Sequence, residues 1–60
     1  MPYLFDSESS DRIGPATAEQ HDASIFAGEA GHVLIDISGV VVREDSWEAR
    51  QPGTRKVFVA

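Results

Sequence analysis

His32 to Arg43, with the sequence HVLIDISGVVVR, is the most apolar stretch of the chain. Ser38 and Gly39 divide it into two runs rich in β-branched residues, and such runs predict two antiparallel strands joined by a turn. The turn is either a two-residue hairpin at Ser38-Gly39 or a longer one that starts at Asp36. The remaining elements must cover this hairpin or extend it.

Alternation along the first strand predicts which side chains reach the core. Val33, Ile35 and Ile37 form a wholly apolar set, which we expect to lie buried under Phe26 of a helix. In the second strand, Val40 and Val42 alternate with Val41 and Arg43. The predicted solvent face consists of His32, Asp36 and Arg43, with Leu34 partly covered.

A helix is predicted over residues 16–27. Thr17 is followed three residues later by Gln20, which is the spacing of a capping box at a helix start. Gly28 and Gly31 are both suitable stops at the other end. A helix this short needs packing against a sheet to be stable.

The two ends of the chain are expected to complete the domain. Tyr3-Leu4-Phe5 either adds an edge strand or packs on the sheet, and residues 6–11 form a loop that Gly14-Pro15 closes. Residues 44–50 are open to three interpretations, a strand, a helical turn or a connecting loop, of which we favour the loop. Residues 51–54, with Pro and Gly at the central positions, predict a tight turn. Residues 55–59 then form the last strand, with Val57 and Val59 on one face and Phe58 on the other.

The sequence therefore predicts an α+β fold, with one short helix packed on a three-stranded antiparallel β-meander. The 60 residues form a single small domain, with residues 1–14 as a loop or edge segment, 16–27 as the helix and 32–59 as the sheet. A domain of this size has a stability of about 3–5 kcal/mol. The chain has no cysteine, so no disulfide can add to this. We find no signal peptide and no apolar run long enough to cross a membrane, so we expect a cytoplasmic protein.

The charge is unevenly distributed along the chain. The net charge is −5, and all of the excess acid lies in residues 1–31, which contain six carboxylates and only one arginine. Residues 32–60 carry four acids and four bases. An acidic surface repels nucleic acid and membranes and attracts basic partners, although such a charge can also serve only solubility. The candidate partner-binding residues are Asp6, Glu8, Asp11, Glu19, Asp22 and Glu29.

Catalytic and metal sites find little support in the sequence. The chain has no nucleophile motif, phosphate-binding loop or HExxH pattern, so we expect neither an enzyme nor a cofactor. His21, His32 and Asp36 are acceptable zinc ligands, but their spacing matches no structural zinc site. A basic strip of Arg43, Arg50, Arg55 and Lys56 is balanced by nearby acid, so direct nucleic-acid binding is disfavoured.

Trp47, the only tryptophan, has two interpretations. The favoured one is structural, because a small domain usually buries much of a lone tryptophan, and Trp47 then plugs one end of the core. The alternative is an exposed anchor for a partner protein.

In size and charge layout the chain looks like anti-CRISPR proteins, a class of small acidic inhibitors without a shared motif. The resemblance implies a non-enzymatic inhibitor, encoded by a phage or mobile element and active in the bacterial host cytoplasm. Its carboxylates would imitate a nucleic-acid backbone and block the basic nucleic-acid-binding surface of a host complex, as a monomer or weak homodimer. The alternative function is a structural or homo-oligomerising module without inhibitory activity, which an exposed edge strand would favour.

Overall fold

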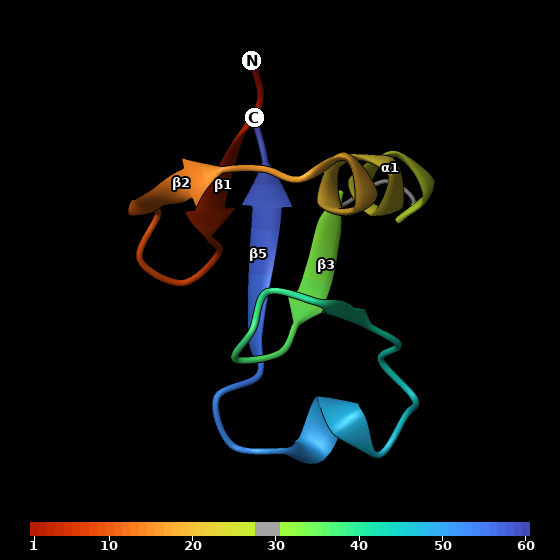
Figure 1. Ribbon diagram of the computed structural model, residues 1–60. Helices are drawn as coiled ribbons and strands as arrows, with labels where there is room; N and C mark the ends of the chain where they lie inside the picture. The colour runs from red at the N-terminus through yellow and green to blue at the C-terminus, as the bar shows by residue number, and fades with distance from the viewer. Residues whose placement is uncertain (28–30) are drawn as a thin grey trace.

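The computed structural model describes residues 1–27 and 31–60, in which one α-helix packs on one antiparallel sheet (Figure 1). The elements in chain order are β1 (Tyr3–Asp6), β2 (Arg12–Pro15), α1 (Ala18–Phe26), β3 (His32–Ile35), β4 (Val41–Val42), the 3₁₀ helix η2 (Glu48–Arg50) and β5 (Arg55–Val59). The predicted α+β class with one short helix is confirmed.

The sheet of the described residues has five strands in the order β2-β1-β5-β3-β4. The predicted three-stranded meander is therefore wrong in detail, because β5 lies between β1 and β3 and pairs with both. Residues 1–14, expected as a loop or edge segment, contain β1 as an interior strand and most of the edge strand β2. Leu4 of β1 pairs with Val59 and is buried, so the two ends of the chain lie side by side (Figure 1).

Gly14 and Pro15 belong to β2 and do not close the preceding loop as expected. Proline has no amide hydrogen to donate to a neighbouring strand, and β2 tolerates Pro15 because it is an edge strand. The polar segment before it is the turn of the β1–β2 hairpin. Ser10 in this turn has a φ of 66°, and its amide donates to the Asp6 carbonyl at 2.8 Å.

The capping box at the start of α1 is confirmed. The Gln20 amide donates to Thr17 Oγ1 at 3.0 Å, and the Thr17 amide donates to Gln20 Oε1 at 2.9 Å. Gln20 is only 4% exposed, and its Nε2 donates to the Gly39 carbonyl at 2.8 Å. One side chain thus starts the helix and fixes it to the β3–β4 turn. The helix ends at Phe26 with Ala27 as its C-cap residue, so the predicted stop at Gly31, where φ is 65°, is wrong. The other predicted stop, Gly28, lies outside the described residues.

The turn between β3 and β4 is the longer of the two predicted alternatives. The Asp36 amide donates to the Val40 carbonyl at 2.9 Å, and Gly39 has a φ of 86°, which suits glycine. Asp36 Oδ1 accepts bonds from the amides of Ser38 and Val40 at 2.8 and 3.0 Å. Val41 therefore pairs with Ile35 and packs on the core.

This register corrects the expected facing of the second strand. We expected Val40 and Val42 on the same side, opposite Val41 and Arg43, with Arg43 facing solvent. Val41 instead faces the core, because a one-residue change in register moves every side chain of a strand to the other face.

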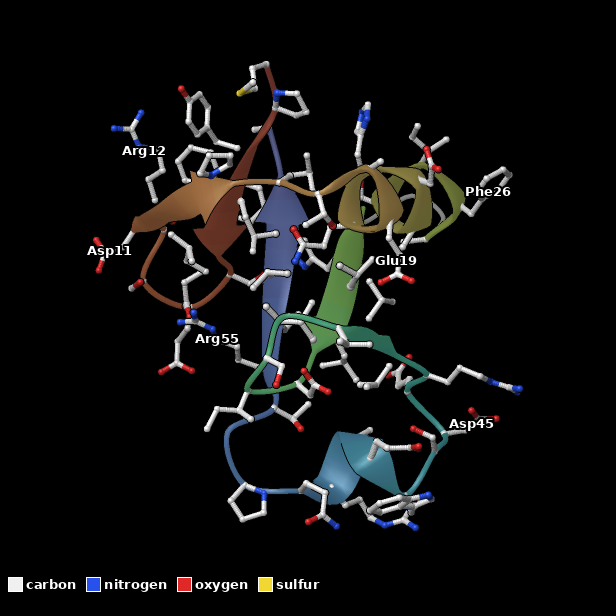
Figure 2. All side chains as sticks on the ribbon, in the orientation of Figure 1. Asp11, Arg12, Glu19, Phe26, Asp45 and Arg55 are labelled. Atoms are coloured by element: carbon white, nitrogen blue, oxygen red, sulfur yellow. The ribbon has the colours of Figure 1, made fainter. Side chains whose placement is uncertain are left out.

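The core lies between α1 and one face of the sheet. Its buried apolar residues, among those described, are Leu4, Val33, Ile35 and Val57. The expected burial of Ile37 and Phe26 is wrong, since they are 85% and 86% exposed. β3 ends at Ile35, which leaves Ile37 in the turn. Figure 2 shows Phe26 at the end of the helix, pointing away from the sheet.

Alanines supply the face of the helix segment that packs on the core. Ala16, Ala23 and Ala27 contact the buried cluster. Small side chains let the helix approach the branched residues of the sheet closely, so the core is filled without the bulky side chain of Phe26.

Residues 44–50 connect β4 to the turn before β5, as in the favoured interpretation, but their second half forms the helical turn η2, which was an alternative. Trp47, and not Asp45 or Ser46, is its N-cap residue. The expectation that Trp47 plugs the core is wrong, because its side chain lies in this loop and is 62% exposed. The turn at 51–54 is confirmed by a bond of 3.3 Å from the Thr54 amide to the Gln51 carbonyl and by a φ of 89° at Gly53. β5 follows as predicted, with Val57 buried in the core.

Candidate partner-binding surfaces

Asp6, at the end of β1, is engaged within the chain. Its Oδ1 accepts bonds from the amides of Glu8 and Ser9 at 2.8 and 3.0 Å, and its Oδ2 lies 3.5 Å from Arg55 Nη1. The amide of Ser9, that of Glu8 and the nearby guanidinium all favour the ionised carboxylate, so they lower the pKa of Asp6 below its ordinary value of 3.8. This carboxylate holds the β1–β2 turn in shape.

Four of the other candidate acids are exposed on two elements. Glu8 and Asp11 lie in the β1–β2 turn, and Glu19 and Asp22 lie on α1. The i, i+3 spacing of the helical pair places both carboxylates on one face of the helix. Glu29, the last of the six predicted residues, lies outside the described residues.

These four carboxylates take part in no ion pair within the described part of the chain. The ion pairs there join Arg55 to Asp6 and Arg43 to Asp45. Figure 2 shows Asp11 and Glu19 well apart, one beside β2 and the other on the helix. The acids therefore form a diffuse negative surface and not one compact cluster.

Trp47 remains available for contact with a partner. It comes directly before η2 in the loop between β4 and β5, and most of its side chain is open to solvent. The exposed-anchor interpretation of this residue stays a prediction.

The three side chains considered as zinc ligands, for which no metal site was predicted, lie on different elements. His21 is exposed on the helix, His32 lies against the Phe58 ring with 5.7 Å between centroids, and Asp36 is the acceptor in the β3–β4 turn. Over residues 1–27 and 31–60, no group of three or more His, Cys, Asp or Glu side chains could hold a metal ion. The expectation of a non-enzymatic protein stays a prediction.

The sheet face opposite the helix was missed by the sequence analysis. Phe5, Phe58 and His32 stand side by side on β1, β5 and β3, and we call these three rings the aromatic ladder. The rings of Phe5 and Phe58 stack with 5.3 Å between centroids and 11° between planes. The ladder could be found only in part from the sequence, because it depends on the pairing of β1 with β5.

Further side chains extend this open face on both sides of the ladder. The Arg12 guanidinium of β2 lies over the Tyr3 ring, 4.8 Å from its centroid. Leu34 pairs with Lys56 on one side and with Val42 on the other, so these three also share the open face. The apolar side chains of the open face are partly exposed, in contrast to the buried residues under α1.

Comparison of the chain with models of known families, with curated proteins and with solved structures gives no significant match. Among the described residues, no helix is both long and apolar enough to cross a membrane.

Proposed function

We propose that this protein is a small non-enzymatic inhibitor that covers the basic nucleic-acid-binding surface of a host protein. The observation that carries the proposal is the set of exposed carboxylates Glu8, Asp11, Glu19 and Asp22, which have no ion-pair partner among the described residues. Their charge is free to attract an external basic partner. The resemblance to anti-CRISPR proteins in size and charge layout supports a phage or mobile-element origin and action in the bacterial cytoplasm.

The arrangement of the carboxylates fits a partner that normally binds a charged backbone. The phosphates of a nucleic acid are spaced along its backbone, and a protein that binds them makes many separate contacts. Carboxylates on a turn and on a helix present spread charge of the same sign. Each exposed pair contributes only about 0.2–1 kcal/mol, so binding depends on several of them together.

Asp6 is left out of the proposed contact set. Its carboxylate already accepts two backbone bonds and faces Arg55, so a partner would have to compete with these contacts. Reversing Asp6 to Lys would also remove the acceptor of the Glu8 and Ser9 amides and disturb the turn that presents Glu8 and Asp11.

The first experiment identifies a target by pull-down from a bacterial lysate, read by mass spectrometry. We expect a nucleic-acid-binding protein with a basic groove as prey. With the purified target, this protein and the target's own nucleic acid should exclude each other in a competition assay. A target that binds both at the same time would contradict the proposal.

The second experiment compares matched reversals of charge. Glu8 and Asp11, or Glu19 and Asp22, are changed to Lys in pairs, and the control pair is Glu44 and Asp45, exposed in the loop after β4. Every pair changes the net charge by the same amount. We expect the first two reversals to weaken binding by about tenfold or more and the control to change it little.

Calorimetry at two salt concentrations completes the test, because charges separated by about 8–10 Å or more in solution are screened at physiological salt. Circular dichroism confirms that each variant is folded. Equal losses of affinity in all three variants would show that only the net charge matters. Unchanged affinity in the first two variants would refute the proposed surface.

A further inference from the structure

The outward surface of α1 carries two large apolar side chains that the core does not use. Ile25 and Phe26 are 61% and 86% exposed, whereas the helix packs on the sheet through Ala23 and Ala27. A single exposed apolar residue is ordinary on a protein surface, but these two are adjacent and lie at the end of the same helix. Neither belongs to the buried cluster, so their size contributes little to the core.

These side chains lie beside two carboxylates of the proposed contact set. Successive helix residues are about 100° apart, so Glu19, Asp22, Ile25 and Phe26 share an arc of about 120°, which we call the helix arc. Asp22 is three residues from Ile25 and four from Phe26, which makes it the neighbour of both. Figure 2 shows Glu19 near the start of the helix and Phe26 at its end, pointing away from the sheet. The helix arc therefore presents negative charge and an aromatic ring together.

We propose that the helix arc occupies a single-stranded nucleic-acid site on the target, with Ile25 and Phe26 where that site stacks a base. The inference rests on the proposed inhibitory function and adds the class of target to it. Proteins that bind single strands combine cations that follow the phosphates with aromatic side chains on which the bases stack. The helix arc offers the complement of both, carboxylates for the cations and apolar surface for the stacking side chain.

The apolar pair decides between single-stranded and duplex sites. In a duplex the bases are stacked on one another, and most protein hydrogen bonds go to phosphates and sugars. A surface made for that backbone is charged and hydrated, and it gains little from an exposed benzyl ring. A single-stranded site has a stacking platform that is vacant without nucleic acid, so burial of Phe26 there adds to the attraction between charges.

Charge also decides against a second copy of the chain on this surface. Glu19 and Asp22 are exposed and take part in no ion pair among the described residues. A two-fold contact between helix arcs would bring these carboxylates against their own copies, and like charges at an interface cost binding energy. A basic partner instead gains from both.

The first test separates the two classes of target. A bacterial lysate is passed over immobilised duplex DNA and then over immobilised single-stranded DNA and RNA, and the proteins eluted from each are offered to this protein on beads. Wild type should capture a protein from the single-stranded fraction, and a single-stranded oligonucleotide, but not the duplex of the same sequence, should displace it. Capture from the duplex fraction alone would overturn the inference and leave the inhibitory proposal standing. Capture from neither fraction would overturn both.

The second test measures the contact made by the apolar pair. With the captured protein, Phe26→Ser should raise the dissociation constant by about tenfold or more, whereas Phe26→Tyr keeps the ring and should change it little. The matched control is Ile37→Ser, which removes an equally exposed side chain from the β3–β4 turn and should leave the affinity unchanged. Ile25→Ser should also weaken binding, and it replaces Phe26→Ser if circular dichroism shows that variant to be unfolded.

Salt dependence separates this contact from that of the carboxylates. An apolar contact is not screened, so the factor lost with Phe26→Ser should be the same at two salt concentrations, whereas reversal of Glu19 and Asp22 to Lys should cost more affinity at low salt. If the charge reversal weakens binding and neither serine variant does, the inference is overturned and the inhibitory proposal stands. A loss with Phe26→Ser that shrinks as salt rises would also overturn it, by assigning the ring to a cation of the target.

Discussion

The two faces of the sheet are built from alternate residues of the same strands, yet they differ in chemistry and in burial. The covered face carries small branched residues such as Val33 and Val57, which are buried under α1. The open face carries the rings of Phe5 and Phe58, which are only partly buried. Stability is therefore expected to reside mainly on the covered face, while the open face is available for binding.

Replacing a residue of the covered face should have the largest effect. Ile35→Ala removes a side chain that is 3% exposed and leaves a cavity, at a cost of about 2–5 kcal/mol. This is comparable to the whole stability of so small a domain, so the variant should be largely unfolded by circular dichroism. The control is Leu34→Ala, which changes the preceding residue of β3 on the open face and should cost less. Equal losses of stability would contradict the difference between the faces.

Breaking the link between the helix and the β3–β4 turn should have the next largest effect. Gln20→Ala removes the reciprocal capping bond and leaves the Gly39 carbonyl without its side-chain donor, at a cost of about 1–3 kcal/mol in urea unfolding. Gln20→Glu keeps an acceptor for the Thr17 amide but loses the donor to Gly39. If Gln20→Glu is as stable as wild type, the bond to Gly39 does not hold the helix in place.

Local features of the covered face could be predicted from the sequence. The capping box of Thr17 and Gln20 depends on residues three apart, and the burial of Val33 and Ile35 follows from alternation within a strand. The same is true of the turn at 51–54, where Pro and Gly specify the geometry. Each depends on neighbours in the chain, and each is confirmed.

Features that depend on distant pairing could not be predicted. The place of β5 between β1 and β3 requires knowledge of which strands meet, and the aromatic ladder follows from that place. The exposure of Ile37 depends on where β3 ends. The longer of the two possible turns ends β3 at Ile35 and leaves Ile37 in the turn. The candidate acids could be named from the charge pattern, but the engagement of Asp6 by two backbone amides could not.

The open face can be examined by a double-mutant cycle on its central rings. Phe5→Leu, Phe58→Leu and the double variant should give a coupling of about 0.5–1.5 kcal/mol, the value typical of stacked aromatic pairs. Chemical denaturation of the four proteins measures it. A coupling near zero would mean that the two rings are neighbours without a stabilising contact between them.

The smallest effect is expected at Asp6, beyond the helix-covered part of the sheet. The folded state lowers the pKa of this carboxyl below its ordinary value of 3.8, mainly through the amides of Ser9 and Glu8 and less through Arg55. The native state thus binds fewer protons than the unfolded state, and stability from this group is fully present above the unfolded pKa. It is lost as the pH falls through the folded pKa.

Urea unfolding at a series of pH values from about 5 to 2 measures this contribution. The free energy of unfolding should be higher for wild type than for Asp6→Asn at the upper end of this range, and the difference should shrink as the pH falls. Asn can still accept the two amide bonds, so the variant keeps the turn and removes the charge. Arg55→Gln should reduce the pH dependence less than Asp6→Asn, because the amides are the larger cause of the shift. If Arg55→Gln abolishes the pH dependence entirely, the ion pair with Arg55, and not the turn amides, lowers the pKa of Asp6.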